Sequence, residues 1–317
     1  MASSSHPRDL RAELETLTTE AFRPELAGID RLETLEIATL MNGEDATVPA
    51  AVAARLPGIA AAIDAIAPRM ARGGRLVYAG AGTAGRLGVL DASECPPTFN
   101  TDPSRVVGLI AGGPEAMVTS VEGAEDSREL AAADLDALGL TDRDTVVGVS
   151  ASGRTPYAVG AVQHARGLGA LTVGLSCNAG SPLAAAADHG IEIVVGPELL
   201  TGSTRLKAGT AQKLVLNMLS TITMIRLGKT YGNLMVDVRA SNDKLRARSR
   251  RIVALATGAT DEEIERALTA TGGEVKDAIL TILAGVDGPT AARLLAENGG
   301  HLRAALDDTA DAADATG

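Results

Sequence analysis

The chain is organised around residues 75–98, RLVYAGAGTAGRLGVLDASECPPT. An apolar run is followed by a glycine-dense turn, which leads into a helix-like segment that ends at two prolines. Gly80, Gly82 and Gly85 allow the backbone to turn tightly and approach a ligand, and the helix that follows offers unpaired N–H groups to an anion. The stretch therefore predicts a strand, a phosphate-binding loop and a helix in one piece.

Residues 80–85 also fit the G-x-G-x-x-G pattern of dinucleotide-binding folds, so a nicotinamide or flavin site is an alternative. Such a fold needs an Asp or Glu at the end of the next strand to bind the ribose hydroxyls. The next strand-like run, 106–111, instead ends in Gly-Gly-Pro, and Asp102 precedes it. The pattern therefore favours a phosphate site without a dinucleotide, and no cofactor is expected.

Composition restricts the core and the partners. Aromatic residues make up 2% of the 317 residues, so the core is Ala, Leu, Val and Ile, which suits helices packed on a parallel sheet. The net charge of −11 argues against nucleic acid or an anionic membrane as the main partner. No run approaches the roughly 18 apolar residues of a membrane span, and the N-terminus lacks an apolar signal core. Cys95 and Cys177 show no paired spacing, which suits a reducing cytoplasm and predicts no metal site.

Five short, β-branched runs alternate with helix-like runs between residues 76 and 195. Strands that are covered on both faces have this composition, and the intervening lengths suit right-handed crossovers. The pattern predicts an α/β fold, with an open parallel sheet of about five strands, helices on both faces and ligands at the carboxyl ends of the strands. The expected strands are 76–79, 106–111, 145–149, 171–175 and 191–195, and the expected helices are 85–92, 115–138, 155–167 and 181–188.

The rest of the chain divides around this domain, which we expect over residues 49–250. Residues 1–48 read as an N-terminal helical arm, with 1–8 disordered and two helices interrupted near Pro24 and Gly28. Residues 251–306 read as a small module of three or four helices, and the acidic tail 307–317 as disordered.

A second hydroxyl-rich loop, SASGRTPY (150–157), follows the third expected strand. Ser150, Ser152 and Thr155 offer hydroxyls beside the first loop, although a serine before a helix is often only an N-cap. Further on, a long apolar helix carries Arg205 and Lys207 in its first turn, where cations oppose the helix dipole. A solvated basic face would also explain these two cations, but we expect them to face a bound anion.

The two loops resemble those of the sugar isomerase (SIS) domain and, more narrowly, those of the N-acetylmuramic acid 6-phosphate etherase family. The resemblance covers roughly residues 28–255, and the small C-terminal helical module is also similar. One departure is Ala84, which stands where the family pattern G-T-S-G-R has a serine. The resemblance is carried by GAGTAGRLGVLDASECPPT (80–98), VEGAEDS (121–127), SASGRTPY (150–157), TGSTRLKAGTAQKLVLNMLST (201–221) and GNLMVDV (232–238).

The resemblance implies a carbon–oxygen lyase that cleaves the D-lactyl ether of N-acetylmuramic acid 6-phosphate, in the recycling of cell-wall amino sugars. By the matching motifs, the two proton-transfer groups are Glu94 and Glu125, which we assign as acid and base respectively. The sequence fits the reversed assignment equally well, and each could also be an ordinary helix-end carboxylate. The implied substrate-binding residues are Thr83, Ala84 through its backbone, Ser150, Ser152, Thr155, Arg205 and Lys207.

Two other functions stay open at this point. A sugar-phosphate-sensing regulator of the glucokinase-regulator type belongs to the same family, but it would have a second SIS domain. A sugar-phosphate isomerase is weakened by the lack of a His in the motif loops. The apolar helix after residue 206 and the N-terminal arm offer more apolar surface than one sheet face covers, so a homodimer is expected.

Overall fold

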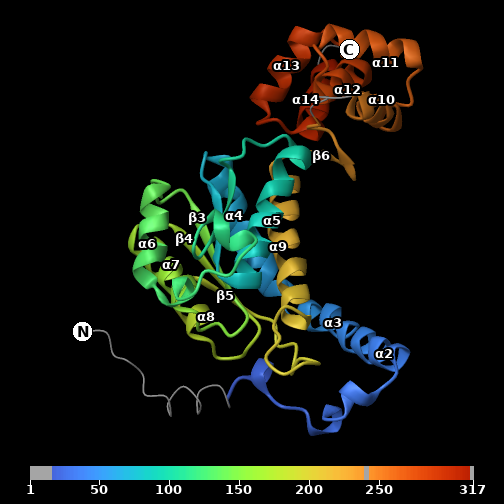
Figure 1. The fold of residues 1–317 in the computed structure, drawn as a ribbon. Coiled ribbons are helices and arrows are strands. Elements are labelled where there is room, and N and C mark those ends of the chain that lie inside the picture. The colour runs from blue at the N-terminus through green and yellow to red at the C-terminus, as the bar shows by residue number, and fades with distance from the viewer. Residues whose placement is uncertain (1–15, 239–242, 315–317) are drawn as a thin grey trace. The chain divides into compact units, whose positions relative to one another are not determined.

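The computed structural model describes residues 16–238 and 243–314 (Figure 1). These residues form two compact units. The first contains the described residues up to Ser93 together with Ser104–Ser220, and the second contains Glu94–Pro103 and the described residues from Thr221 onward. The expected disorder of residues 1–8 concerns a part of the chain outside the described residues.

The first unit is built on a five-stranded, wholly parallel sheet with the order β2-β1-β3-β4-β5. The α/β prediction is confirmed, and four strands lie where the apolar runs predict them. The fifth begins and ends earlier than the expected 191–195, because it is His189–Glu192 that pairs with β4. The strands are β1 (Leu76–Gly80), β2 (Val106–Ile110), β3 (Thr145–Ser150), β4 (Leu171–Ser176) and β5 (His189–Glu192).

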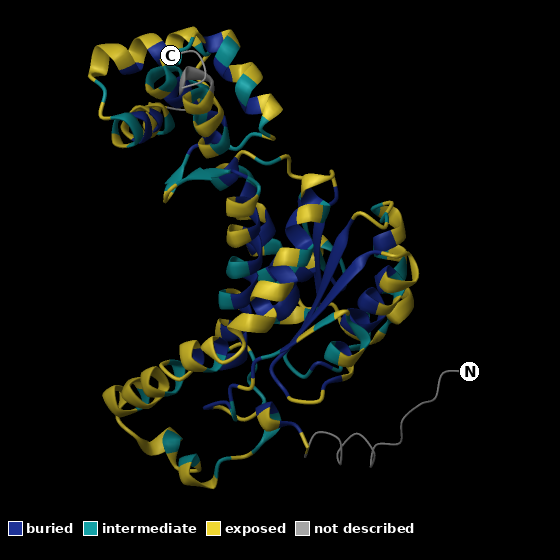
Figure 2. Ribbon diagram, turned by 180° about the vertical axis from the view of Figure 1, so that it is seen from behind, coloured by how far each residue is buried: buried dark blue, intermediate teal, exposed yellow. Residues whose placement is uncertain are grey.

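Helices cover both faces of the sheet (Figure 1). On one face, Val77 and Val146 pack with Leu135 and Tyr157 from the helices α6 and α7. On the other face, α4 presents buried residues at helical spacing, including Ile59, Ile63, Ile66 and Met70. Strands β1, β3 and β4 are buried throughout, as expected for the middle of a sheet between two helical layers, whereas the edge strands β2 and β5 are only partly buried (Figure 2). The helices of the unit are α3 (Val48–Ala53), α4 (Leu56–Ala71), α5 (Gly82–Phe99), α6 (Arg128–Ala137), α7 (Pro156–Gly167), α8 (Pro182–Ala186) and α9 (Lys207–Arg226).

Two helix predictions need correction. The helix α5 was expected to end before Pro96–Pro97, but it continues through both prolines to Phe99. Cys95 and Phe99 lie one turn apart on this last part of the helix and are both buried, so packing holds the helix beyond the prolines. The single helix expected over 115–138 is instead two short 3-10 helices, η4 (Pro114–Met117) and η5 (Ala124–Asp126), followed by α6.

The N-terminal arm is less helical than expected. Within the stretch where two helices were predicted, three short 3-10 helices of three residues each precede the first α-helix of the described chain, α2, which covers Thr34–Asp45. No residue of α2 is buried. The 3-10 helices are η1 (Thr18–Glu20), η2 (Pro24–Leu26) and η3 (Ile29–Arg31).

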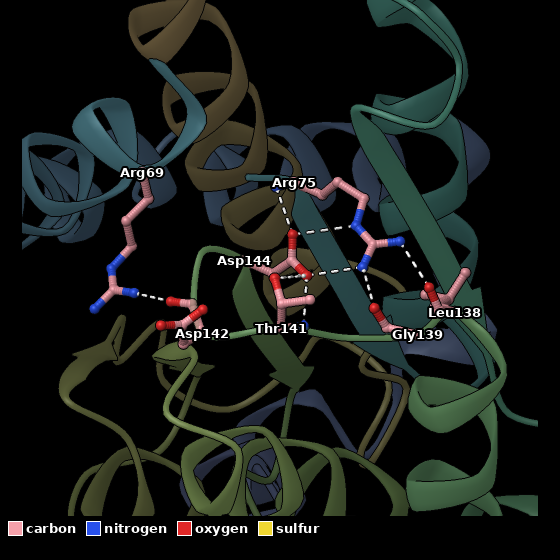
Figure 3. Close-up of polar contacts among 7 residues, drawn as sticks. All are labelled: Arg69, Arg75, Leu138, Gly139, Thr141, Asp142 and Asp144. Atoms are coloured by element: carbon pink, nitrogen blue, oxygen red, sulfur yellow. Dashed lines mark hydrogen bonds and ion pairs between the residues drawn. The ribbon is translucent and has the colours of Figure 1, made fainter. Parts of the chain in front are cut away.

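An ion pair between Arg75 and Asp144 joins β1 and β3 at the amino-terminal edge of the sheet (Figure 3). The Asp144 carboxylate, at the start of β3, accepts hydrogen bonds from the backbone N–H and the guanidinium of Arg75, at the start of β1. Arg75 also donates to the carbonyls of Leu138 and Gly139. Burial raises the pKa of Asp144, but the bonds from Arg75 and from the Thr141 N–H outweigh it and hold that pKa below its ordinary value.

The second unit contains five helices and a small hairpin in its described residues. The helix α10 begins at Asp243, before the expected start of the module at residue 251, and the module has more than the three or four helices expected. The tail predicted to be disordered is helical as far as Asp314, because α14 buries Leu302 and Ala305 in the core of the module. The elements are β6 (Thr230–Tyr231), β7 (Leu234–Met235), α10 (Asp243–Thr257), α11 (Asp261–Ala270), α12 (Val275–Ala284), α13 (Gly288–Glu297) and α14 (Leu302–Asp314).

No single helix within residues 16–238 and 243–314 is long and apolar enough to cross a membrane. Two bent helix pairs, α2–α3 with α4 and α12 with α13, reach that length and composition only when they are taken together.

Candidate functional site

The strand order places the two predicted anion loops side by side. All strands are parallel, but the order in which the chain adds strands reverses between β1 and β3, because β2 lies on one side of β1 and the later strands lie on the other. In open α/β sheets ligands bind at the carboxyl ends of the strands at such a switch point. Gly80 at the end of β1 is paired in register with Val149, one residue before the end of β3. A Cβ at Gly85 would lie 2.6 Å from the Gly80 carbonyl oxygen, so only glycine lets the first turn of α5 approach the strand this closely.

The loop after β3 gathers three hydroxyls. Ser150 Oγ lies 2.8 Å from Thr155 Oγ1 and 3.3 Å from Ser152 Oγ. The Gly153 N–H donates to Ser150 Oγ, and the Arg154 N–H donates to Ser152 Oγ. The N-cap of α7 is Thr155 rather than Ser152, and its side chain makes no capping hydrogen bond. The hydroxyls therefore face one another across the turn, next to a helix end whose first N–H groups no side chain caps.

The start of α9 adjoins the first loop. A Cβ on Gly209 would lie 3.4 Å from the Thr83 methyl group, so α9 passes close to the first turn of α5. Thr83 is half-buried and Ala84 is buried, which leaves the threonine side chain as the more accessible of the two. The sequence motifs 80–85, 150–157 and 204–209 thus meet at one edge of the first unit.

The cations at the start of α9 differ from the expectation. The Lys207 ammonium lies 2.6 Å from Glu44 of the arm, and only 5% of its side chain is exposed. Burial raises the pKa of Glu44, but the hydrogen bonds from Lys207 and Arg23 outweigh it and keep that pKa below its ordinary value. Arg205 is exposed in the turn before the helix. The ion pair with Glu44 therefore accounts for the placement of Lys207 without a bound anion.

A buried carboxylate that the sequence patterns did not single out occupies the amino end of α9. Glu198 is fully buried and accepts the backbone N–H groups of Lys207 and Ala208, both at 2.9 Å. Burial raises its pKa, while these two bonds and the Lys207 charge oppose that rise. The α9 terminus is therefore already satisfied within the chain, unlike that of α7.

The two carboxyls assigned to catalysis are both exposed. Glu125 lies in η5, and the residue before this 3-10 helix, Gly123, has a left-handed conformation (φ 74°) that turns the chain. Glu94 lies on α5 one turn beyond Asp91 and belongs to the second unit, whereas Glu125 belongs to the first. Ser150, Ser152 and Thr155 are brought together within the first unit, while the pair of glutamates is divided between the two units.

Asp91 holds the middle of α5 in place, and no motif pointed to it. Its buried carboxylate accepts hydrogen bonds from Tyr78 of β1 at 2.7 Å and from Asn217 and Ser220 of α9 at 2.6 and 3.1 Å. Burial raises its pKa, and the three neutral donors only partly offset that rise. The Asp91 carboxyl thereby ties three elements of the first unit together.

Two family models match parts of the first unit and its continuation along α9. The family described as "Glucokinase regulatory protein N-terminal SIS domain" matches residues 58–166, and the SIS domain family matches residues 125–222. A phosphoheptose isomerase from Francisella tularensis is 20% identical, with a TM-score of 0.47 over 61% of this chain and 100% of that one.

Two relatives match almost the whole chain. A protein of Streptomyces avermitilis named N-acetylmuramic acid 6-phosphate etherase is 87% identical over 96% of this chain and 98% of its own length. A protein of the same name from Rubrobacter xylanophilus is 63% identical over 92% of this chain and 97% of its own length.

Proposed function

Because the chain belongs to the N-acetylmuramic acid 6-phosphate etherase family, we propose that it cleaves the D-lactyl ether at C3 of N-acetylmuramic acid 6-phosphate. The products are N-acetylglucosamine 6-phosphate and D-lactate, and the reaction serves the recycling of cell-wall amino sugars. The observation that carries the proposal is the near full-length identity with the curated etherases. A regulator with two SIS domains and a sugar-phosphate isomerase are less favoured, because the match to the etherases also covers the C-terminal module of this chain.

The reaction needs two proton transfers, because an ether is a poor leaving group. In the ring-opened sugar the C1 carbonyl acidifies the proton on C2, a base removes that proton, and an acid protonates the departing ether oxygen. Water then adds at C3. We assign the base to Glu125 and the acid to Glu94, and both are exposed and so accessible to a ligand.

The sugar 6-phosphate is assigned to the loops at the ends of β1 and β3. Thr83 and the three hydroxyls of Ser150, Ser152 and Thr155 supply side-chain donors, and the backbone N–H of Ala84 adds another. Support comes from the hydroxyls of Ser152 and Thr155, which both lie within 3.3 Å of Ser150 Oγ, and from the position of both loops at the switch point of the sheet. Arg205 and Lys207 remain further proposed contacts, although Lys207 already pairs with Glu44.

The working form is proposed to be a cytoplasmic homodimer. Helix α2 buries none of its residues and exposes Leu35, Leu40 and Met41, and Ile222 and Ile225 are exposed near the end of α9. Exposed large apolar side chains that the chain itself leaves uncovered are typical of surfaces that a second subunit covers. A monomer at micromolar concentration in sedimentation would contradict this assembly.

The direct test is to incubate the purified protein with N-acetylmuramic acid 6-phosphate and to assay D-lactate. Lactate release confirms the reaction, and equal turnover of the unphosphorylated sugar would contradict the phosphate site. A protein that releases no lactate refutes the proposed function.

The two glutamates are tested separately. Glu125→Gln should abolish both lactate release and the exchange of the C2 proton with deuterated solvent, because it removes the base. Glu94→Gln should stop lactate release by at least about 10²-fold, the low end for a positioned proton-transfer group, but leave some C2 exchange in the intact substrate. The reverse exchange pattern would interchange the two roles, and near-parental lactate release by Glu94→Gln would remove it from the mechanism.

A further inference from the structure

The amino-terminal residues 17–20, which we call the strap, dock on the end of β4 close to the loop after β3. Leu17 and Thr19 of the strap are buried, and Thr19 is fully so. Thr19 accepts a hydrogen bond at Oγ1 from Asn178 Nδ2 at 3.0 Å. Residues about 160 positions apart in the sequence therefore meet in a buried polar contact.

Asn178 uses its whole amide group in this contact. Its Oδ1 accepts from Thr18 Oγ1 at 2.8 Å and from the Thr19 N–H at 3.4 Å. Its Nδ2 donates to Thr19 Oγ1 and to the carbonyl of Ala151, each at 3.0 Å. An amide has two acceptor and two donor positions, so all four are used and the side chain is fixed in one orientation.

The Ala151 carbonyl links this contact to the hydroxyl cluster. It accepts a second hydrogen bond, from the Cys177 N–H at 2.9 Å, so its peptide plane is held from two sides. Ala151 lies between Ser150 and Ser152. Any rotation of that peptide plane would move both serine hydroxyls relative to each other.

The strap also reaches the loop before α9. A Cβ on Gly202 would lie 2.6 Å from Glu20 Oε2, so the Glu20 side chain rests on the backbone of that loop. The strap thus contacts the loop before α9 directly and the loop after β3 through Asn178. Leu17 and Thr19 of the strap are buried and Glu20 is half-buried, whereas Thr18 is exposed.

We propose that Thr19 and Asn178 are positioning residues for the phosphate site, which hold the Ala151 peptide and thereby preorganise Ser150 and Ser152. The proposal rests on the proposed function only for the identity of the ligand. Neither residue touches the reacting atoms. Their loss loosens the binding of the phosphate group and leaves the proton-transfer steps unchanged, because preorganised donors lose affinity when their support is removed.

The test compares matched threonine variants in the full chain. Thr19→Val keeps the shape but removes the Oγ1 acceptor, and Thr19→Ser keeps the hydroxyl. The control is Thr172→Val, because Thr172 is equally buried and bonds Asp188, but it lies near the amino end of β4, away from the loops. Thr18→Val removes only one bond at an exposed residue and so spares the fold.

For Thr19→Val we expect KM for N-acetylmuramic acid 6-phosphate and Kd for N-acetylglucosamine 6-phosphate to rise about three- to tenfold, the factor that corresponds to one buried hydrogen bond. The value of kcat should stay within about twofold, Thr19→Ser should restore KM, and Thr172→Val should lower Tm without changing KM. Unchanged KM and Kd in Thr19→Val, or an equal rise in Thr172→Val, would overturn the proposal.

Two further outcomes are also decisive. If Thr19→Val does not fold, the same measurements on Thr18→Val decide. We then expect KM and Kd to rise about twofold or more, and unchanged values would overturn the proposal. If the parent protein releases no lactate, the proposed function fails, but calorimetric binding of N-acetylglucosamine 6-phosphate still tests the strap because it needs no turnover.

Discussion

Gly153 is the position where the hydroxyl loop tolerates a side chain least. Its φ is +69°, and an added Cβ would lie 2.4 Å from Ser181 Cβ and 2.8 Å from Ser176 Cβ. Its N–H also donates to Ser150 Oγ. Gly153→Ala therefore combines backbone strain with a clash beneath the candidate phosphate site.

The size of the effect follows from these two terms. A left-handed conformation costs a residue with a Cβ about 1–2 kcal/mol, and overpacking in a closely packed site costs about 1–3 kcal/mol. The sum, about 2–5 kcal/mol, corresponds to a fall in Tm of about 5–15 °C for a domain of this size. Because the clash displaces the loop, KM for the phosphorylated sugar should rise at least about tenfold, the equivalent of 1.4 kcal/mol.

Gly139→Ala is the matched control. Gly139 also has a positive φ, +59°, but no heavy atom lies within 4 Å of its added Cβ, and it follows α6 at the opposite edge of the sheet. Thermal unfolding and steady-state kinetics of the two variants separate strain from clash. Gly139→Ala should lose only the strain term and keep the parental KM. Equal Tm losses and equal KM values in the two variants would refute the reasoning.

Two predictions concern pH. The lowered pKa of Asp144 means that its bonds with Arg75 stabilise the fold above the unfolded-state pKa and cease to do so as pH falls through the lowered value. Asp144→Asn should therefore cost about 2–4 kcal/mol at pH 7 by thermal unfolding, and a difference from the parent that does not shrink below about pH 4 would contradict this. Burial raises the pKa of Asp91 above its unfolded-state value, so binding a proton at Asp91 stabilises the fold. This contribution to the free energy of unfolding is fully present below the unfolded-state pKa and is lost as pH rises through the raised value. Because asparagine does not titrate, the Tm of Asp91→Asn should rise relative to the Tm of the parent between about pH 4 and pH 8. A Tm difference that stays constant over this range would argue that Asp91 carries no such cost.

The sheet and its loops were predictable because their signals are local. Strands buried on both faces need continuous apolar runs, and β1, β3 and β4 have them. The glycines and hydroxyls then follow directly after strands β1 and β3. The strand β5 was displaced because it begins with His189 and Gly190, which carry no apolar signal but pair in register with β4.

The helix ends were less predictable because packing overrides local preference. Two prolines indicate the end of a helix, yet α5 continues through them to the buried Phe99. The acidic composition after residue 306 indicated disorder, yet α14 extends to Asp314 after the buried residues Leu302 and Ala305. In both places the burial of side chains in the folded chain, and not the local composition, decides how far the helix extends.

The polar contacts around the site could not be read from the sequence at all. Lys207 pairs with Glu44, which is 163 residues away, and no spacing rule connects them. Asn178 and Thr19 are similarly separated, and each alone is an unremarkable polar residue. The sequence therefore indicated which loops bear donors, whereas the residues that hold those loops became visible only in the folded chain.

The distribution of charge over the sheet has a consequence for how the first unit holds an anion. The amino edge contains the Arg75–Asp144 pair, and near the carboxyl edge Lys207 is engaged by Glu44, so these charges are largely neutralised within the chain. The candidate phosphate loops instead present hydroxyls and backbone N–H groups, which are dipoles that act over short distances. Such donors attract a phosphate only once it is in contact. If the proposed loops hold the phosphate, we expect a chain with a net charge of −11 to bind a phosphorylated sugar without a basic surface, because the contacts then lie inside the loops and do not depend on the field of the whole protein.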